Sequence, residues 1–167
     1  MPNRHPNYQR KFTAVALTAM LPLLASAGIH IKDVPIEERT KGAQKVAIVE
    51  IESTQSEKEV NEKGDNLIVT RAKVKVKEKL KGKFEASPTD LIIEGGELNG
   101  ITLRVSDQPE LKPGEQYVAF LNEKEKGKSD RPHRRGLGLM KIKGDKVDNG
   151  MSLDEVREKV KKAAQTK

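Results

Sequence analysis

The sequence predicts a mainly β protein, an antiparallel small barrel or sandwich of six or seven strands with one C-terminal α-helix. Three observations support this class. Short apolar-rich stretches recur from residue 43 to residue 147, and turn residues separate them. Several of these stretches alternate apolar and polar residues, as half-buried strands do. Only the last stretch, from residue 151 onward, has the apolar spacing of an amphipathic helix.

The first 27 residues have the composition of a secretory signal peptide. Arg10 and Lys11 end a basic start, residues 12–24 are mostly apolar, and residues 25–27 (Ala-Ser-Ala) are small enough for cleavage. As a helix, residues 12–24 would rise only about 20 Å, short of the roughly 30 Å hydrocarbon core of a membrane. We therefore expect cleavage after Ala27 rather than retention as a membrane anchor, and a periplasmic or secreted protein of bacterial type.

The rest of the chain divides into three parts. Residues 28–42 are polar with one proline, which predicts an extended lead-in or a short helical turn. Residues 43–149 form the expected β domain, and residues 150–167 the helix and tail. At the start of the β domain, residues 46–51 have apolar side chains on both alternating faces. This pattern predicts a strand that is buried on two sides.

The second predicted strand is unusually long. It runs from Leu67 to Leu80, about 14 residues where five or six are usual. A strand of this length bends or coils, as strands do in small barrels. The charged segment before it, residues 55–66, predicts an exposed loop.

The remaining elements follow in shorter pieces. Further strands are expected at residues 89–95, 101–106, 115–121 and 136–142, with a brief last strand at Val147. A glycine-rich turn at residues 95–100 joins the first two of them. Residues 122–135 have no apolar side chain and predict a long solvated loop. In the final helix, Ser152 and Glu155 have the spacing of a capping box.

Composition limits the classes of function. The chain has no cysteine, which excludes disulfides, thiolate nucleophiles and zinc–thiolate sites. Three Phe, two Tyr and no Trp are too few for a platform that stacks bases or sugar rings. The net charge of +7 falls to +4 after residue 27, because three of the 32 cations and none of the 25 carboxylates precede it. This modest charge argues against nucleic acid as a partner.

Motifs for catalysis or metal binding are missing from the sequence. The three histidines lie outside any H-E-x-x-H arrangement, and there is no G-x-S-x-G. A calcium loop starting at Asp145 would need oxygen ligands where Val147 and Val156 stand. The segments GGELNG and GLGLMK lack the residues that complete phosphate-binding loops. We therefore expect a protein that is not an enzyme and has no catalytic residues, metal site or cofactor.

The long second strand carries a row of cations. Every other residue from 71 to 81 is basic: Arg71, Lys73, Lys75, Lys77, Lys79 and Lys81. A straight row could follow a polyanion such as lipopolysaccharide or an acidic glycan. The alternative, which we favour, is the solvated face of a sheet, because Glu50 and Glu57 can pair with these cations from the neighbouring strand.

Four stretches together carry a resemblance to a family, over residues 46–142. They are VKVKEKLKG (74–82), GGELNGITLRVSDQP (95–109), LKPGEQYVAFL (111–121) and GLGLMKI (136–142). The pattern resembles small, exported bacterial β-proteins that are often encoded beside secreted metalloproteases of the matrixin type. The stretch ending in LKG is more weakly similar to netrin-like and metalloprotease-inhibitor domains, which implies an OB-like barrel. Those inhibitors place an N-terminal cysteine on the protease zinc, so their mechanism does not carry over to this cysteine-free chain.

The candidate binding residues lie in residues 95–106, from the sequence GGE to the sequence RVS. They are Gly95, Gly96, Glu97, Gly100, Arg104 and Ser106. Two glycines before an acid allow another backbone to approach closely, and Arg104 could bind a carboxylate with two hydrogen bonds. The alternative, again the one we favour, is a tight hairpin in which Glu97 or Asp107 pairs with Arg104.

These observations together predict an exported binding or accessory module. Its partner is expected to be another exported protein, such as a secreted protease or an envelope component. The alternative partner is an acidic polymer, bound along the basic face of residues 71–81. No stable membrane span is expected once the signal peptide is removed.

Overall fold

The computed structural model describes residues 34–61, 63–84, 89–125 and 129–166. The expected signal peptide, its cleavage site and the first residues of the lead-in lie outside these ranges. The described residues form two α-helices, a 3₁₀ helix and nine strands: α1 (Ile36–Gly42), β1 (Lys45–Val60), β2 (Asn66–Lys81), β3 (Thr89–Glu94), β4 (Gly96–Leu98), β5 (Ile101–Leu103), β6 (Gln116–Glu125), β7 (Ser129–Pro132), η1 (Arg135–Gly138), β8 (Leu139–Lys143), β9 (Lys146–Val147) and α2 (Leu153–Gln165).

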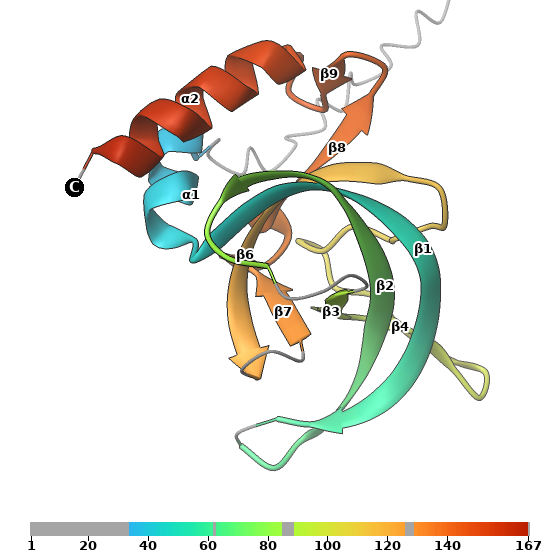
Figure 1. The fold of residues 1–167 in the computed structure, drawn as a ribbon. Helices are drawn as coiled ribbons and strands as arrows, with labels where there is room; N and C mark the ends of the chain where they lie inside the picture. Colours follow the sequence, from blue (N-terminus) through green and yellow to red (C-terminus); the bar gives the residue numbers. More distant parts are fainter. Residues whose placement is uncertain (1–33, 62, 85–88, 126–128, 167) are drawn as a thin grey trace, which may run out of the picture. The chain divides into compact units, whose positions relative to one another are not determined.

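Five of the strands close into a barrel. Neighbouring strands follow the order β1, β2, β3, β7, β6, and β6 pairs back to β1. These pairings are antiparallel except for that between β3 and β7, which is parallel. The result is a small, OB-like barrel, which confirms the predicted fold class. The predicted count of six or seven strands was too low, since nine are described, and the β3–β7 pairing departs from the predicted antiparallel arrangement. Figure 1 shows β1 and β2 bending together around one side of it, as expected of a strand as long as the predicted second one.

The first strand is buried on both faces, as predicted. Ala47, Val49 and Ile51 lie in the core inside the barrel, where they meet apolar residues of β2, β3 and β6. Val46 and Ile48 lie in a second core, which the barrel shares with the helices. β1 is therefore a wall between two hydrophobic layers, and this explains why its first half has no polar face.

The two α-helices cover the second core. They pack against each other on the same side of the barrel (Figure 1), and Val156 and Val160 of α2 are buried there. The side chain of Ser152 accepts a hydrogen bond of 3.2 Å from the backbone N–H of Glu155, which confirms one half of the predicted capping box. The reciprocal bond, to the side chain of Glu155, is not found among the described residues. α1 occupies the second half of the predicted lead-in, so the helical alternative holds there rather than the extended one.

The prediction of loops at residues 55–66 and 122–135 is largely wrong. β1 continues to Val60 and β2 begins at Asn66, so only a short turn remains between them. β6 extends to Glu125, and β7 then runs through Ser129–Pro132. Both segments are rich in charge, but several of their charged side chains pair with opposite charges on neighbouring strands, as Glu59 does with Lys124 and Arg131. Such pairing stabilises a solvated strand and leaves no apolar pattern in the sequence.

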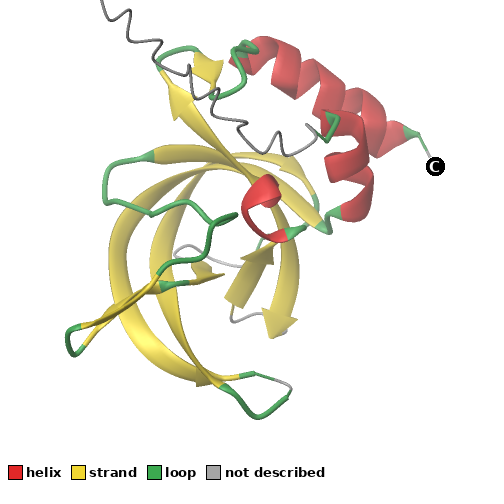
Figure 2. Ribbon diagram, turned by 180° about the vertical axis from the view of Figure 1, so that it is seen from behind, coloured by secondary structure: helices red, strands yellow, loops and turns green. Residues whose placement is uncertain are grey.

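Half of the predicted glycine-rich turn at residues 95–100 is a strand. It contains β4, which forms a two-stranded hairpin with β5. The hairpin projects from the barrel in both Figure 1 and Figure 2. β5 ends at Leu103, so Arg104 and Ser106 lie in the loop behind it and not in a strand. The predicted strand at residues 136–142 begins instead with η1.

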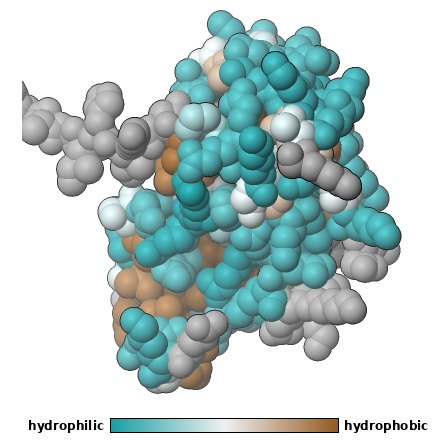
Figure 3. Space-filling model, turned by 90° about the vertical axis from the view of Figure 1, so that its left-hand side faces the viewer, coloured by the Kyte–Doolittle hydropathy of each residue, from teal (hydrophilic) through white to brown (hydrophobic). Residues whose placement is uncertain are grey.

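One face of the molecule is mainly polar. Figure 3 shows the side that carries β6 and α1 as largely hydrophilic, with its largest hydrophobic area in the lower part. Among the described residues, the large apolar side chains that are more than half exposed are Val60 and Ile101. None of the helices described here is long and apolar enough to cross a membrane.

Candidate functional site

A pocket of about 520 Å³ lies between the mouth of the barrel, the β4–β5 hairpin and the loop that follows the hairpin. We call it the hairpin pocket. β1 and β2 contribute Thr54, Ser56 and Thr70 from the barrel, and residues 102–106 and 108–111 form the opposite wall. Its lining therefore has hydroxyl groups on one side and a mixture of polar and apolar side chains on the other.

The hairpin pocket brings together five of the six predicted binding residues: Gly95, Gly96, Glu97, Arg104 and Ser106. Gly100 is not among its lining residues. It follows Asn99 in the turn between β4 and β5, where both residues have positive φ angles, of 52° and 77°. Gly100 thus serves the geometry of the hairpin tip, as the alternative interpretation predicts.

Gly96 lets the hairpin lie directly on the barrel. A Cβ atom at this position would stand 2.6 Å from Oγ of Ser56 and 2.7 Å from Oγ1 of Thr70, and φ is 138°. The hydroxyl of Thr70 donates a hydrogen bond of 2.7 Å to the carbonyl oxygen of Gly95. The backbone N–H of Glu97 donates to Oγ of Ser56 at 3.3 Å. The two glycines therefore permit close approach of a backbone, but that backbone belongs to the hairpin itself.

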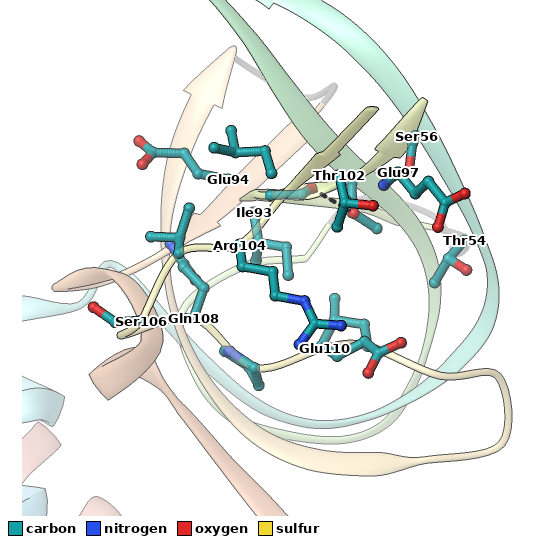
Figure 4. A pocket seen from close by; sticks show the side chains of 17 residues that line it. Thr54, Ser56, Ile93, Glu94, Glu97, Thr102, Arg104, Ser106, Gln108 and Glu110 are labelled. Carbon is teal, nitrogen blue, oxygen red and sulfur yellow. Dashed lines mark hydrogen bonds between the residues drawn. The ribbon is translucent and has the colours of Figure 1, made fainter. Parts of the chain in front are cut away.

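The predicted ion pair of Arg104 with Glu97 or Asp107 is not found among the described residues. Asp107 pairs instead with Arg135 of η1, at 3.3 Å, and the same arginine lies 2.7 Å from Glu94. Arg104 is exposed, and Figure 4 shows its side chain extended into the pocket from the loop after β5. Arg135 thus braces the rim of the pocket, and Arg104 points into the space where a ligand would lie.

One polar atom of the pocket lining has an unmet hydrogen-bonding capacity. Oε1 of Gln108 is buried, and no donor within the described structure reaches it. A buried carbonyl oxygen without a donor is energetically unfavourable, by roughly 1–3 kcal/mol. A ligand that brings an N–H or O–H group could remove this cost.

Only some of the cations of the predicted basic face are available to bind a ligand. Arg71 pairs with Glu57 at 2.7 Å and with Asp90 at 3.2 Å, and Lys77 pairs with Glu50 at 3.1 Å. The hydrogen bond from Lys77 lowers the pKa of Glu50. Lys81 is half-buried and donates to the carbonyl oxygens of Thr40 and Ala43, which joins the end of β2 to the end of α1. These cations have structural partners, as the solvated-face interpretation predicts.

The other three cations of this face are Lys73, Lys75 and Lys79, all of them exposed. Among the described side chains, no ion pair joins any of them to a carboxylate. β2 is strongly curved in Figure 1, so the cations do not form the straight row that the sequence suggested.

A buried pair of charges, Lys45 and Asp130, lies at the opposite end of β1 and was not predicted from the sequence. Nζ of Lys45 lies 3.0 Å from Asp130 and 3.1 Å from Glu123, and 5.7 Å from the centre of the Phe84 ring. Burial raises the pKa of Asp130 despite the attraction of Lys45. Burial alone would lower the pKa of Lys45, but hydrogen bonds to the two carboxylates outweigh it and raise the pKa. A charged residue gives no sign of burial in sequence when its counter-charge is 85 positions away.

His133 is the histidine that the structure describes, and it behaves as a fixed hydrogen-bond acceptor. Its Nδ1 lies 3.1 Å from Nδ2 of Asn122, while Oδ1 of Asn122 accepts from the backbone N–H of Gln44 at 3.0 Å. This second bond orients the amide so that Asn122 donates to Nδ1, which must then be unprotonated. Burial lowers the pKa of His133, and the charges of Arg134 and Lys81 lower it further against the opposing effect of Glu38.

The protein is expected to lose stability as the pH falls below about 6.5, the usual pKa of histidine. Because the pKa of His133 is depressed in the folded state, the unfolded chain takes up the proton first, and the equilibrium shifts towards unfolding. Urea midpoints at pH 7.5 and pH 5.5 measure the effect. His133→Asn keeps an acceptor at this place without a titrating ring, and should lose less stability over this interval. Since the two proteins share all other groups, equal losses would contradict this role of His133.

Among the described residues, no group of three or more His, Asp or Glu side chains is arranged to hold a metal ion. The hairpin pocket combines hydroxyls, carboxylates, one guanidinium and one amide with apolar side chains such as Ile93, Leu103 and Leu111. Its polar groups are suited to hydrogen bonding and charge recognition. No protein-family model matches the chain, and no curated protein matches it.

Proposed function

We propose that the protein is a non-enzymatic binding module that holds a segment of another exported protein in the hairpin pocket. The observation that carries this proposal is the convergence of Gly95, Gly96, Glu97, Arg104 and Ser106 on one pocket of about 520 Å³. Pockets of roughly 300–1,000 Å³ are typical ligand sites. The composition of a signal peptide supports export, and the resemblance to proteins found beside secreted metalloproteases supports a protease or an envelope protein as the partner.

The pocket favours binding over catalysis. Its carboxylates, Glu94, Glu97 and Glu110, come from three different segments, and none of them is paired with a histidine or a metal site in the described structure. The hydroxyls of Thr54 and Ser56 and the guanidinium of Arg104 can donate to a ligand, while the carboxylates can accept from it. Such a mixture recognises polar groups without activating a nucleophile.

Capture from the periplasm and culture fluid of the source bacterium tests the proposal. The full chain is used as wild type, as Arg104→Glu and as Lys143→Glu, the last a charge reversal at an exposed position on β8. We expect a protein that is retained by wild type and Lys143→Glu and lost with Arg104→Glu. Titration of that protein, once purified, should show binding about tenfold weaker for Arg104→Glu. Equal binding to all three chains would contradict a role of the hairpin pocket.

A second candidate function is binding of an acidic polymer, and the three exposed lysines Lys73, Lys75 and Lys79 favour it. Neutralising three phosphates or sulfates would make binding depend on salt. Reversal of all three lysines to glutamate should then lower the salt concentration that elutes the chain from heparin. Reversal of Lys112, Lys143 and Lys161, exposed elsewhere, is the control for net charge. If both triple variants elute together, the basic face is not a polyanion site.

A further inference from the structure

We propose that the hairpin pocket binds an extended, basic peptide segment, which pairs as an added strand with the free edge of β5 and places a lysine or arginine side chain among the carboxylates of the pocket. This inference deepens the proposed function and depends on it. Three observations carry it: an unpaired strand edge beside the pocket, an excess of carboxylates, and a buried acceptor without a donor.

The unpaired edge belongs to β5. Within the described structure, β4 and β5 form a separate two-stranded sheet, in which Leu98 faces Ile101 and Gly96 faces Leu103. Hydrogen-bonded and non-bonded pairs alternate along an antiparallel hairpin, and a two-residue turn is flanked by a bonded pair. The intervening residue, Thr102, therefore directs its backbone N–H and C=O away from β4. Thr102 also lines the hairpin pocket, so a peptide added at this edge would run beside it.

The charge of the pocket selects a basic peptide. Glu94, Glu97 and Glu110 line it against a single cation, Arg104. Glu94 is already paired with Arg135, and Glu110 has only a loose pair with Lys112, at 3.6 Å between exposed side chains. For Glu97 the described residues provide no ion pair. A cationic side chain from the peptide would complete the pairing, while Arg104 remains able to donate to carbonyl groups of the added strand.

The buried Oε1 of Gln108 also lacks a hydrogen-bond donor within the described structure. A guanidinium has five N–H groups and an ammonium three, whereas a carboxylate has none. A basic side chain could thus satisfy Gln108 and the carboxylates together. Figure 4 shows Gln108 and Glu110 on one side of Arg104, and Glu97 and Thr102 on the other, and all of these residues line the pocket.

A peptide fits these features better than a sugar. No aromatic side chain lines the pocket, so the stacking that carbohydrate and nucleic-acid sites use is missing from its lining. An added strand instead bonds through backbone N–H and C=O groups, and Thr102 offers one of each at the edge of β5.

Selection from a library tests the inference. Random nine-residue peptides displayed on phage are panned on the full chain, and enriched peptides are synthesised with a fluorescent label for anisotropy titration. We expect enriched sequences to share one lysine or arginine flanked by β-formers. Glu97→Gln combined with Glu110→Gln should weaken binding about tenfold, while Glu52→Gln combined with Glu158→Gln, at exposed positions elsewhere, should not.

Substitution of Thr102 tests strand addition directly. Thr102→Pro removes the outward N–H without removing a bond to β4, and should weaken binding about tenfold. Thr102→Val keeps the N–H and loses only the side-chain hydroxyl, so it should weaken binding clearly less than Thr102→Pro does. Enriched peptides that are neutral or acidic but still need Arg104 would overturn the basic-peptide inference and leave the proposed function standing. The inference would also be overturned if the enriched peptides bound every pocket variant as tightly as wild type, or if no peptide were enriched. In either case the capture experiment with whole exported proteins decides the proposed function.

Discussion

Replacing Asp130 with alanine is expected to lower the free energy of unfolding by about 3 kcal/mol, the lower end of the cost of breaking a buried ion pair. Asp130 is 1% exposed and lies 3.0 Å from Lys45, which is itself 7% exposed. Loss of the carboxylate leaves the ammonium group of Lys45 in the barrel with only Glu123 to balance it, and this remaining partner is why a larger loss is not expected. Urea denaturation followed by circular dichroism measures the change.

The matched control removes both charges. Lys45→Met combined with Asp130→Leu leaves no uncompensated charge in the barrel, and apolar replacements of buried pairs are often neutral or stabilising. We expect this double variant to lie within about 1 kcal/mol of wild type. A double variant that is as unstable as Asp130→Ala would mean that these two positions need their shapes or hydrogen bonds, and that the unpaired charge is not the cause.

Replacing Gly136 with alanine is expected to destabilise the fold by about 3 kcal/mol and to weaken binding in the hairpin pocket. A Cβ atom at Gly136 would stand 1.6 Å from the carbonyl oxygen of Asp107 and 2.7 Å from its carbonyl carbon. These atoms belong to a backbone and cannot rotate away, so the loop that carries Arg104 and Gln108 must shift. Urea denaturation measures the first effect, and titration with a captured partner measures the second.

Gly150→Ala is the control for this prediction. No heavy atom lies within 4 Å of the position that its Cβ would occupy, and its φ of 86° makes the substitution strained but not obstructed. It should cost about 1 kcal/mol and leave binding unchanged. If Gly136→Ala binds a partner as well as Gly150→Ala does, η1 does not support the pocket loop.

Only some of the residues that line the hairpin pocket could be predicted from the sequence. The glycines, Glu97, Arg104 and Ser106 were identifiable because they belong to a distinctive block of turn and charge residues. Thr54, Thr70 and Gln108 were not, since each is an ordinary polar residue in a strand or loop. Only the approach of the hairpin to β1 and β2 makes them neighbours. Arg104 itself was expected to pair with Glu97 or Asp107, but Asp107 pairs with Arg135, a residue 28 positions further along the chain.

The sequence by itself determined the local features: the class of the fold, the two-sided burial of residues 46–51, the long second strand and the capped final helix. These follow from the period of apolar residues and from hydrogen bonds between near neighbours. Only the tertiary structure decided that β6 closes on β1, that Lys45 and Asp130 are buried together and that the hairpin pocket exists. The physical reason is that these features depend on charges and backbones brought together across the barrel, and such partners leave no periodic signal along the chain.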